Sequence, residues 1–410
     1  MPKFLTLDSF QNVLNGKVAL VRADLNVPWH EGRITDTTRL ERLRTTINDL
    51  RRAGAKVVIL SHFGRPKGAP DPALSLRPVA EALGRVLALP VAFAEDCQGP
   101  VAQKAVAALA PGEILVLENV RFHPGEEKND LTLARAFAAL GDVFVNDAFS
   151  AAHRAHASTT ALADLVPACA GRLMQAELEA LGKALEHPER PIVGVVGGAK
   201  ISTKLDLLKN LLDAVDILIP GGGMANTFLA ALGHDVGASL CERDMLETAR
   251  AILHKATHEN KRVFLPSEVV VRVGRGQGAV IRTVPVTAVP PDGAILDIGP
   301  RGVEDIQQAL SVAKTVVWNG PLGVFEEPPF DRGTTDVARL VADLTQQGKI
   351  VSVAGGGDTV AALTHAGVAE HFSYLSTAGG AFLEWLEGKT LPGVAALARA
   401  KAPSLQEGVT

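Results

Sequence analysis

One repeated pattern limits the folds open to this chain more than any other feature. A short run of β-branched and aliphatic residues ends in glycine or polar residues, and an Ala/Leu-rich stretch follows it. The runs are "KVALV" at 17, "KVVIL" at 56, "EILVL" at 113 and "DVFV" at 142, then "PIVGVV" at 191, "DILIP" at 216, "RVFLP" at 262, "TVVW" at 315 and "KIVSVA" at 349. Runs without alternation are typical of strands buried on both faces, and strand–helix alternation indicates parallel βαβ units. The predicted fold class is α/β, with two doubly wound parallel sheets.

The length of 410 residues is too great for one ordinary core and suits two domains of roughly 200 residues each. In residues 171–191, Met174, Leu178, Leu181 and Leu185 recur at helical spacing. This pattern fits a helix that joins two domains, and it fits an ordinary surface helix equally well. We expect domains at 1–172 and 190–390, a hinge helix at 173–189, and a tail at 391–410 that returns to the first domain.

Composition excludes several classes of protein. The net charge of −4 gives no global basic field for nucleic acid or membrane, so anion binding must come from local clusters. Three scattered cysteines argue against a disulfide scaffold and against a thiolate metal site, and fit a reducing compartment. The N-terminus carries Asp8 and lacks an apolar core, so we expect no signal peptide, and no apolar run reaches the length of a membrane span.

Charged and polar residues follow each predicted strand of the first half, and ligands of parallel sheets bind beyond the carboxyl ends of the strands. These residues are Arg22, Asp24 and Asn26; Ser61, His62 and Arg65; Glu118, Asn119 and Arg121; and Asn146, Asp147, His153 and Arg154, with Arg39 after the first loop. Several arginines at one edge would repel each other unless an anion neutralised them, and their planar fork matches phosphate and carboxylate. The predicted ligand is small, with two anionic groups and a hydroxyl.

The segment "NDAFSAAHRAHAST", residues 146–159, is ambiguous when taken alone. Its two histidines could belong to a metal site, an acid–base pair or an anion cradle. Beside the other arginines, phosphate binding by Arg154 becomes the favoured interpretation, with His153 and His156 in support.

Glycine dominates the strand ends of the second half: "GGAK" at 197, "GGGMANTF" at 221, "NGPLGVFE" at 319, "AGGGDT" at 354 and "STAGGAF" at 376. Glycine lets backbone N–H groups approach phosphate oxygens, and a helix that begins after such a loop favours anions. Lys200 and Lys204 are four residues apart, and Asp358 suits a Mg²⁺ ion that also binds nucleotide phosphates. Together the five loops predict a nucleotide site, although the usual P-loop motif is absent and "GRGQG" at 274 has the wrong spacing for a dinucleotide loop.

Eight segments in order, "VRADLNVP", "SHFGRP", "LENVRF", "NDAFSAAHRAHAST", "GGAKISTKL", "GGGMANTFL", "WNGPLGVFE" and "GGGDT", resemble those of the phosphoglycerate kinase family. The resemblance covers about residues 17–393. It implies a two-domain, cytoplasmic, monomeric glycolytic enzyme with its active site in an interdomain cleft. Such an enzyme moves the acyl phosphate of 1,3-bisphosphoglycerate to Mg-ADP, by in-line transfer after domain closure, and gives 3-phosphoglycerate and ATP. No nucleic acid or membrane partner is expected.

The resemblance also implies roles for individual residues. Asp24 and Asn26 would contact the glycerate; Arg65, Arg121, Arg154 and His62 would hold its 3-phosphate; and Arg39 would bind its carboxyl end. Arg39, Lys200 and the N–H groups of Gly357 and Gly380 would surround the transferring phosphoryl group. The nucleotide would contact Gly198, Ala199, Lys204, Gly222, Gly223, Asn319, Pro321, Glu326 (at the ribose), Gly356, Gly357, Asp358 (holding Mg²⁺) and Thr359.

Three positions depart from the family pattern. Ser150 and Ala151 stand where Gly-Thr is usual, Phe63 stands for Leu, and Ala378 stands for the first of three glycines. The last matters most, because a Cβ there could crowd the phosphate or forbid a positive φ. Rival interpretations are a non-catalytic sensor, a nicotinamide dehydrogenase and a nucleic-acid binder; the second lacks a correctly spaced fingerprint, and the third finds little support in 4% aromatic residues.

Overall fold

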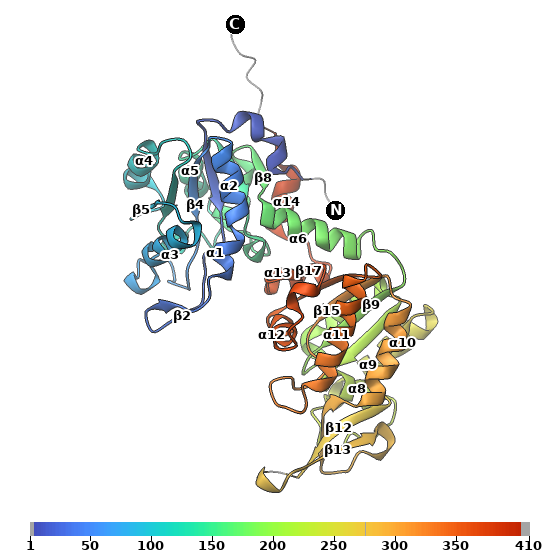
Figure 1. Ribbon diagram of the computed structural model, residues 1–410. Coiled ribbons are helices and arrows are strands. Elements are labelled where there is room, and N and C mark those ends of the chain that lie inside the picture. Colours follow the sequence, from blue (N-terminus) through green and yellow to red (C-terminus); the bar gives the residue numbers. More distant parts are fainter. Residues whose placement is uncertain (1–3, 275, 403–410) are drawn as a thin grey trace. The chain divides into compact units, whose positions relative to one another are not determined.

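The computed structural model describes residues 4–274 and 276–402 of the chain (Figure 1). The chain divides into two compact units. Unit 1 comprises Met1–Leu178 and Thr390–Thr410, and unit 2 comprises Glu179–Lys389, so the division falls inside helix α6 (Arg172–Leu185). Residues 403–410 of the predicted tail lie outside the described residues.

Unit 1 is built on a six-stranded sheet in which every neighbouring pair is parallel. The strand order is β5 (Val91–Ala94), β6 (Ile114–Leu117), β4 (Lys56–Leu60), β1 (Val18–Arg22), β7 (Val143–Asn146) and β8 (Ala168–Ala170). The central strands are buried along nearly their whole length, as their unbroken apolar runs require. The helices of this unit are α1 (Thr38–Arg42), α2 (Arg44–Arg52), α3 (Arg77–Leu87), α4 (Gly99–Ala107), α5 (Leu131–Ala138) and α14 (Pro392–Arg399), and a short hairpin joins β2 (Trp29–His30) to β3 (Arg33–Ile34).

Helix α14 belongs to unit 1 although it follows the whole of unit 2 in sequence. The Gly393 amide donates to the Ala152 carbonyl at 2.9 Å, and Arg399 forms an ion pair with Asp164 at 3.0 Å. Both contacts attach the end of the chain to the segment that follows β7.

Unit 2 holds a second six-stranded parallel sheet. Its order is β11 (Arg262–Val263), β10 (Ile217–Gly221), β9 (Ile192–Gly197), β15 (Thr315–Asn319), β16 (Val351–Gly355) and β17 (Tyr374–Ser376). Its helices are α7 (Leu205–Ala214), α8 (Gly223–Ala231), α9 (Leu246–His258), α10 (Pro300–Ser311), α11 (Arg332–Gln346), α12 (Gly357–His365) and α13 (Gly380–Leu386). The predicted α/β class with two doubly wound parallel sheets is therefore confirmed.

The sequence analysis did not foresee an antiparallel sheet in unit 2, of order β13 (Val280–Pro285), β12 (Glu268–Val273) and β14 (Gly293–Ile298). Strand β13 is largely exposed, and no helix separates these strands, so the strand–helix rule could not detect them. The short edge strands β5, β8 and β17 were missed as well, because their sequences VAFA, ACA and YLS contain few β-branched residues.

Helix α6 ends at Leu185, four residues before the end predicted at 189. The amides of Glu186 and His187 both donate to the Gly182 carbonyl, and this closes the last turn. Pro188 follows, and a residue before proline disfavours the helical conformation.

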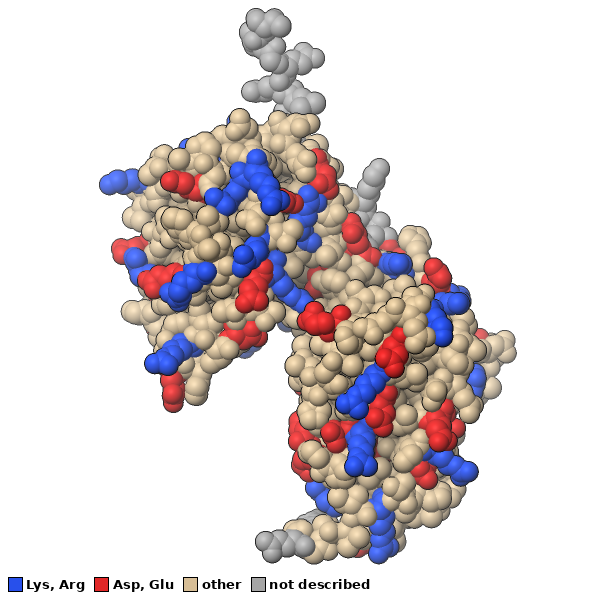
Figure 2. All heavy atoms as spheres, viewed as in Figure 1, with Lys and Arg blue, Asp and Glu red and all other residues tan. Residues whose placement is uncertain are grey.

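Lysine, arginine, aspartate and glutamate are mixed over the face shown in Figure 2. No single-sign field covers that face, as the net charge of −4 leads one to expect. Among the helices of the described ranges, none is both long and apolar enough to cross a membrane.

Candidate functional site

At the carboxyl edge of the unit 1 sheet, the loops after β1 and β4 are tied together. Arg39 Nη1, from α1, donates to Asp24 Oδ1 at 3.0 Å and Oδ2 at 2.9 Å, and to the Asn26 carbonyl at 2.8 Å. Asn26 Oδ1 accepts from the Gly64 amide at 2.9 Å. These bonds hold two predicted substrate residues, Asp24 and Asn26, beside the predicted catalytic arginine.

Ser150, one of the departures from the family pattern, contacts a predicted substrate residue directly. Its Oγ donates to Asp24 Oδ2 at 2.5 Å. Burial acts to raise the pKa of Asp24, but Arg39 and the bond from Ser150 outweigh it and hold that pKa below its ordinary value. Asp24 is therefore a charged acceptor, suited to a hydroxyl group.

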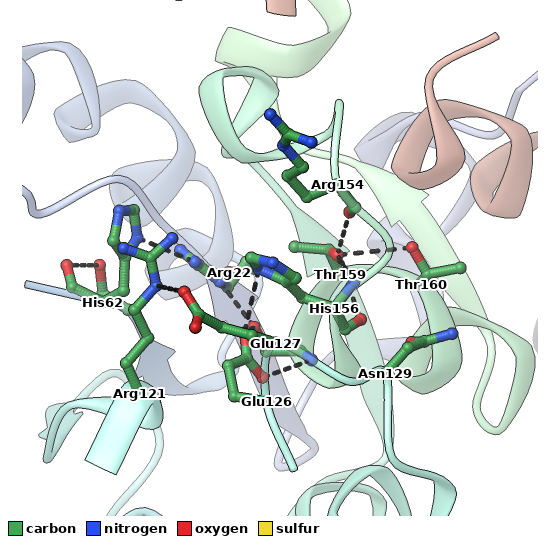
Figure 3. Close-up of polar contacts among 12 residues, drawn as sticks. Arg22, His62, Arg121, Glu126, Glu127, Asn129, Arg154, His156, Thr159 and Thr160 are labelled. Atoms are coloured by element: carbon green, nitrogen blue, oxygen red, sulfur yellow. Dashed lines mark hydrogen bonds and ion pairs between the residues drawn. The ribbon is translucent and has the colours of Figure 1, made fainter. Parts of the chain in front are cut away.

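The remaining cationic residues of this edge come from three different loops. Arg121 Nη1 donates to the Gly64 carbonyl at 2.9 Å, and its Nε lies 3.3 Å from Glu127 Oε1. Arg65 and Arg154 are exposed, and Arg154 extends from the loop after β7 (Figure 3). Burial lowers the pKa of Arg121, and the nearby charge of Arg65 lowers it further. Closely spaced cations of this kind favour a bound anion.

Behind these side chains lie further titratable residues, of which the sequence analysis missed only Glu126. Arg22 is 1% exposed, and Glu126 is fully buried. Burial, with the charges of Arg22 and Arg121, lowers the pKa of His156 to about 4, so that this ring is neutral at neutral pH. Nothing in "GEEKND" distinguishes the buried Glu126 from the exposed Glu127 next to it.

In unit 2, the chain order reverses between β9 and β15, where open parallel sheets bind ligands. Lys204 bridges this point: its Nζ donates to the Gly197 carbonyl and to Asn319 Oδ1, both at 2.7 Å. Burial lowers the pKa of Lys204, and Asp358 acts in the opposite direction. A partly desolvated lysine at a switch point suits an anionic ligand.

The glycine loops around Lys204 are packed too closely for side chains. A Cβ built on Gly320, at φ 97°, would overlap the Gly197 carbonyl, and one on Gly223 would overlap the Ala199 carbonyl. Gly222 (φ 64°) and Gly356 (φ 102°) precede helices α8 and α12. The loops thus present bare backbone and two helix N-termini at one sheet edge, an arrangement that favours phosphate.

The predicted nucleotide residues lie at the end of β15 or in the segments that follow β9, β10, β15 and β16, including the first turns of α8 and α12. The Gly320 amide donates to Thr359 Oγ1, and Asn319 Nδ2 donates to the Gly355 carbonyl, each at 2.7 Å. Asp358 is exposed in the first turn of α12, so its carboxylate is free to share a Mg²⁺ ion with phosphate oxygens. Lys200 and Glu326 are also exposed.

Ala378 does not occupy the positive-φ conformation that the sequence analysis considered. The residue of the β17–α13 loop with positive φ is Gly379, at 57°, and Gly380 begins α13. Among the described residues, the non-glycine positions with positive φ are Glu31, Lys67, Ala88, Asn129 and Asn260. Ala378 therefore imposes no left-handed strain, and the residue is buried, at 8% exposed.

Asp96, Cys97 and His123 also come close together, in the segments that follow β5 and β6 of the unit 1 sheet. Their polar atoms already satisfy one another: His123 Nε2 lies 2.8 Å from Asp96 Oδ1, and Gln98 Nε2 lies 3.0 Å from His123 Nδ1. Burial raises the pKa of the Cys97 thiol well above its ordinary value. A metal would have to displace these bonds, so we assign none here.

Comparisons with known proteins match one family along nearly the whole chain. Residues 8–389 match the family model described as phosphoglycerate kinase. A phosphoglycerate kinase of Rhodospirillum centenum is 62% identical over 394 residues, which is 96% of this chain and 99% of the relative, and one of Methylorubrum extorquens is 59% identical over 397 residues, 97% and 99% of the two chains. The solved phosphoglycerate kinase of Coxiella burnetii superposes with a TM-score of 0.90 at 44% identity, covering 97% of this chain and 100% of that one.

Proposed function

Because this chain belongs to the phosphoglycerate kinase family, it transfers the acyl phosphate of 1,3-bisphosphoglycerate to ADP in glycolysis, and we propose that the residues at its two sheet edges perform this transfer directly. The observation that carries the residue assignments is that the two sheet edges present different anion-binding groups. One gathers arginines around Asp24, and the other gathers glycine loops around Lys204.

At the edge of unit 1, Arg65, Arg121, Arg154 and His62 hold the 3-phosphate of the substrate. The charged carboxylate of Asp24 and the amide of Asn26 bind the glycerate, and Arg39 lies beside them for the carboxyl end. The support for this assignment is that guanidinium groups bind phosphate bidentately, whereas a charged carboxylate accepts a hydrogen bond from a hydroxyl group.

At the edge of unit 2, backbone amides of the glycine loops and Lys204 hold the nucleotide phosphates. The nucleotide residues are Gly198, Ala199, Gly222, Gly223, Asn319, Pro321, Gly356, Gly357 and Thr359, with Glu326 at the ribose. The family uses the magnesium nucleotide, and Asp358 is the residue that would hold the ion, which supplies positive charge to the phosphate oxygens.

The chemistry requires no proton transfer, because the leaving group is a carboxylate, which is a weak base. Positioning and charge stabilisation are therefore the main contributions of the protein, as in phosphoryl transfer generally. Arg39, Lys200 and the amides of Gly357 and Gly380 surround the transferring group and stabilise the charge on its oxygens.

The reacting groups belong to different units, so in-line transfer requires the two units to close on the ternary complex. Closure also excludes water, which would otherwise hydrolyse the acyl phosphate. The unit boundary inside α6 supports this helix as the hinge. Small-angle scattering with and without both ligands tests closure: the radius of gyration should fall in the ternary complex, and an unchanged value counts against it.

A coupled assay with 3-phosphoglycerate and MgATP tests the function itself. We expect turnover that a chelator abolishes and that added Mg²⁺ restores. Binding of both ligands without turnover would favour a sensor, and a requirement for a nicotinamide cofactor would favour a dehydrogenase. We further propose a cytoplasmic monomer, supported by the free thiols of Cys97, Cys169 and Cys241 and by the presence of both loop clusters in one chain; gel filtration with light scattering measures the mass.

A further inference from the structure

A connected set of buried polar residues in unit 1 ends at His62, one of the side chains proposed to hold the phosphate. It consists of Glu126, Ser158, Arg22 and His62, and we call it the buried network; Figure 3 labels Arg22, His62 and Glu126. Ser158 donates to Glu126 twice, from Oγ to Oε1 at 2.6 Å and from the backbone N to Oε2 at 3.0 Å. Arg22 Nε donates to Ser158 Oγ at 2.8 Å, and Arg22 Nη2 lies 3.0 Å from His62 Nδ1.

The contact between Arg22 and His62 decides which nitrogen of the imidazole carries the proton. A guanidinium has only donors and stays charged at any ordinary pH. His62 Nδ1 must therefore accept, and a neutral ring then carries its single proton on Nε2. Burial, reinforced by the charge of Arg22, lowers the pKa of His62 well below its ordinary value, so the ring is neutral at neutral pH.

Arg22 can perform this role only while it is held in place. A guanidinium that is 1% exposed needs a countercharge, and the fully buried Glu126 carboxylate provides it through Ser158. The single proton of the Ser158 hydroxyl points to Glu126, so its lone pairs remain for Arg22 Nε. Burial raises the pKa of Glu126, but Arg22 and the bonds from Ser158 favour its charged form.

We propose that Glu126, Ser158 and Arg22 are positioning residues that hold His62 as the Nε2–H tautomer, so that this histidine meets the substrate phosphate as a neutral hydrogen-bond donor. The inference rests on the proposed function at one point, the contact between His62 and the phosphate. It goes further in identifying three residues behind the contact surface that set the chemical form of a binding residue.

Nitrogen-15 NMR of the full-length wild-type enzyme, labelled at histidine, tests the tautomer directly. A His62→Gln variant assigns the signals. At neutral pH we expect His62 Nδ1 to show the shift of an unprotonated nitrogen and Nε2 that of a protonated one. The opposite pattern in the wild-type enzyme overturns the proposal.

Variants then test whether the network sets this form. In Ser158→Ala the shifts of the two His62 nitrogens should move toward each other, and the KM for 3-phosphoglycerate should rise roughly three- to tenfold, the loss of about one hydrogen bond. The KM for the nucleotide should stay within about twofold, whereas general damage to the fold would change both constants. Glu126→Gln should act in the same direction as Ser158→Ala.

Glu127→Gln is the matched control, because it makes the same substitution at the adjacent, exposed residue. It should leave the nitrogen shifts of His62 as they are in the wild type. If Ser158→Ala also leaves them unchanged, the three residues do not position His62 and the proposal fails. If 3-phosphoglycerate does not perturb His62 in an active enzyme, the assigned phosphate contact fails while the tautomer assignment stands.

Discussion

Under the proposed assignments, the two units bind anions by different means on the same architecture. Each presents a ligand edge at the carboxyl ends of a six-stranded parallel sheet. In unit 1 the edge is made of side chains, and its more buried arginines have acidic partners: Arg39 has Asp24, Arg121 has Glu127, and Arg22 reaches Glu126 through Ser158. In unit 2 the edge is made mainly of backbone, with Lys204 as its one partly buried cation among the described residues predicted to bind nucleotide.

This difference implies different sensitivities to mutation. A side-chain site depends on charge and orientation, so truncating one residue removes one interaction and leaves the fold intact. A backbone site depends on close approach, so adding a single methyl group displaces whole loops. The comparison also shows that the sheet determines where a ligand binds, while the loops determine what binds.

The largest effect should follow from Gly320→Ala in unit 2. Its Cβ would overlap the Gly197 carbonyl, and its φ of 97° is strained for alanine, so unit 2 should lose at least about 3 kcal/mol of stability. Calorimetry should show ADP binding lost while unit 1 still binds 3-phosphoglycerate. Gly348→Ala is the control, since φ is also positive there (66°) but nothing lies within 4 Å, so only about 1 kcal/mol should be lost. ADP affinity close to wild type in Gly320→Ala would contradict the backbone-based site.

Arg39→Ala and Lys200→Ala should have the next largest effects. Each removes one donor from the transferring group without touching the core, and loss of such a donor raises the barrier by roughly 2.7–4 kcal/mol. We expect kcat to fall at least a hundredfold in both variants, measured by the coupled assay, with melting temperatures near that of the wild type. Turnover close to wild type in either variant would remove that residue from the catalytic role.

Much of this contrast could be read from the sequence. Parallel strands buried on both faces are recognised in the sequence as unbroken apolar runs. Because parallel strands end at one edge of the sheet, the residues that follow them lie together at that edge. The loops holding Arg65, Arg121 and Arg154 and the glycines after β9, β10, β15 and β16 follow from that rule. Local rules suffice here, since each loop begins where its own strand stops.

What could not be read depends on contacts between distant residues. Glu126 is buried because Ser158, 32 residues later, closes over it, whereas Glu127 points outward. Ser150 appeared only as a departure from the family pattern, yet its bond to Asp24 spans 126 residues. The antiparallel sheet of unit 2 was missed for another reason, because β13 is largely exposed and β12 and β13 form a local hairpin with no α-helix between them.

Asp297 offers a smaller test, because it is the counterpart in unit 2 of the buried acid Glu126, without an arginine partner. Its Oδ2 accepts from the Gly333 amide at 2.7 Å, and burial, reinforced by Asp331 and Asp336, raises its pKa to about 7. A folded pKa above the ordinary 3.8 means that the native state holds the proton more tightly, so stability falls as pH rises from about 4 to about 7.

Asp297→Asn should remove this fall, because the amide cannot ionise. Between pH 5 and pH 8, the free energy of unfolding of the variant relative to that of the wild type should rise by on the order of 2–3 kcal/mol. Urea denaturation at the two pH values measures the change. Asp343→Asn, at an exposed position on α11, should run parallel to the wild type. If the stability of Asp297→Asn changes with pH as that of the wild type does, this carboxyl is already ionised at pH 5.

The smallest effect is expected at Ala378, where the backbone site of unit 2 tolerates a side chain. The strained position of its loop is Gly379, at φ 57°, and the Ala378 amide donates to Ser376 Oγ at 3.3 Å, so the methyl group occupies ordinary backbone. Ala378→Gly should therefore change kcat less than tenfold in the coupled assay, which is less than about 1.4 kcal/mol in the barrier. Gly379→Ala is the contrasting variant: it places a side chain at positive φ, and it should lower kcat more than Ala378→Gly changes it. A gain of more than tenfold in Ala378→Gly would mean that this methyl group obstructs the transferring phosphoryl group and that close approach governs this loop as well.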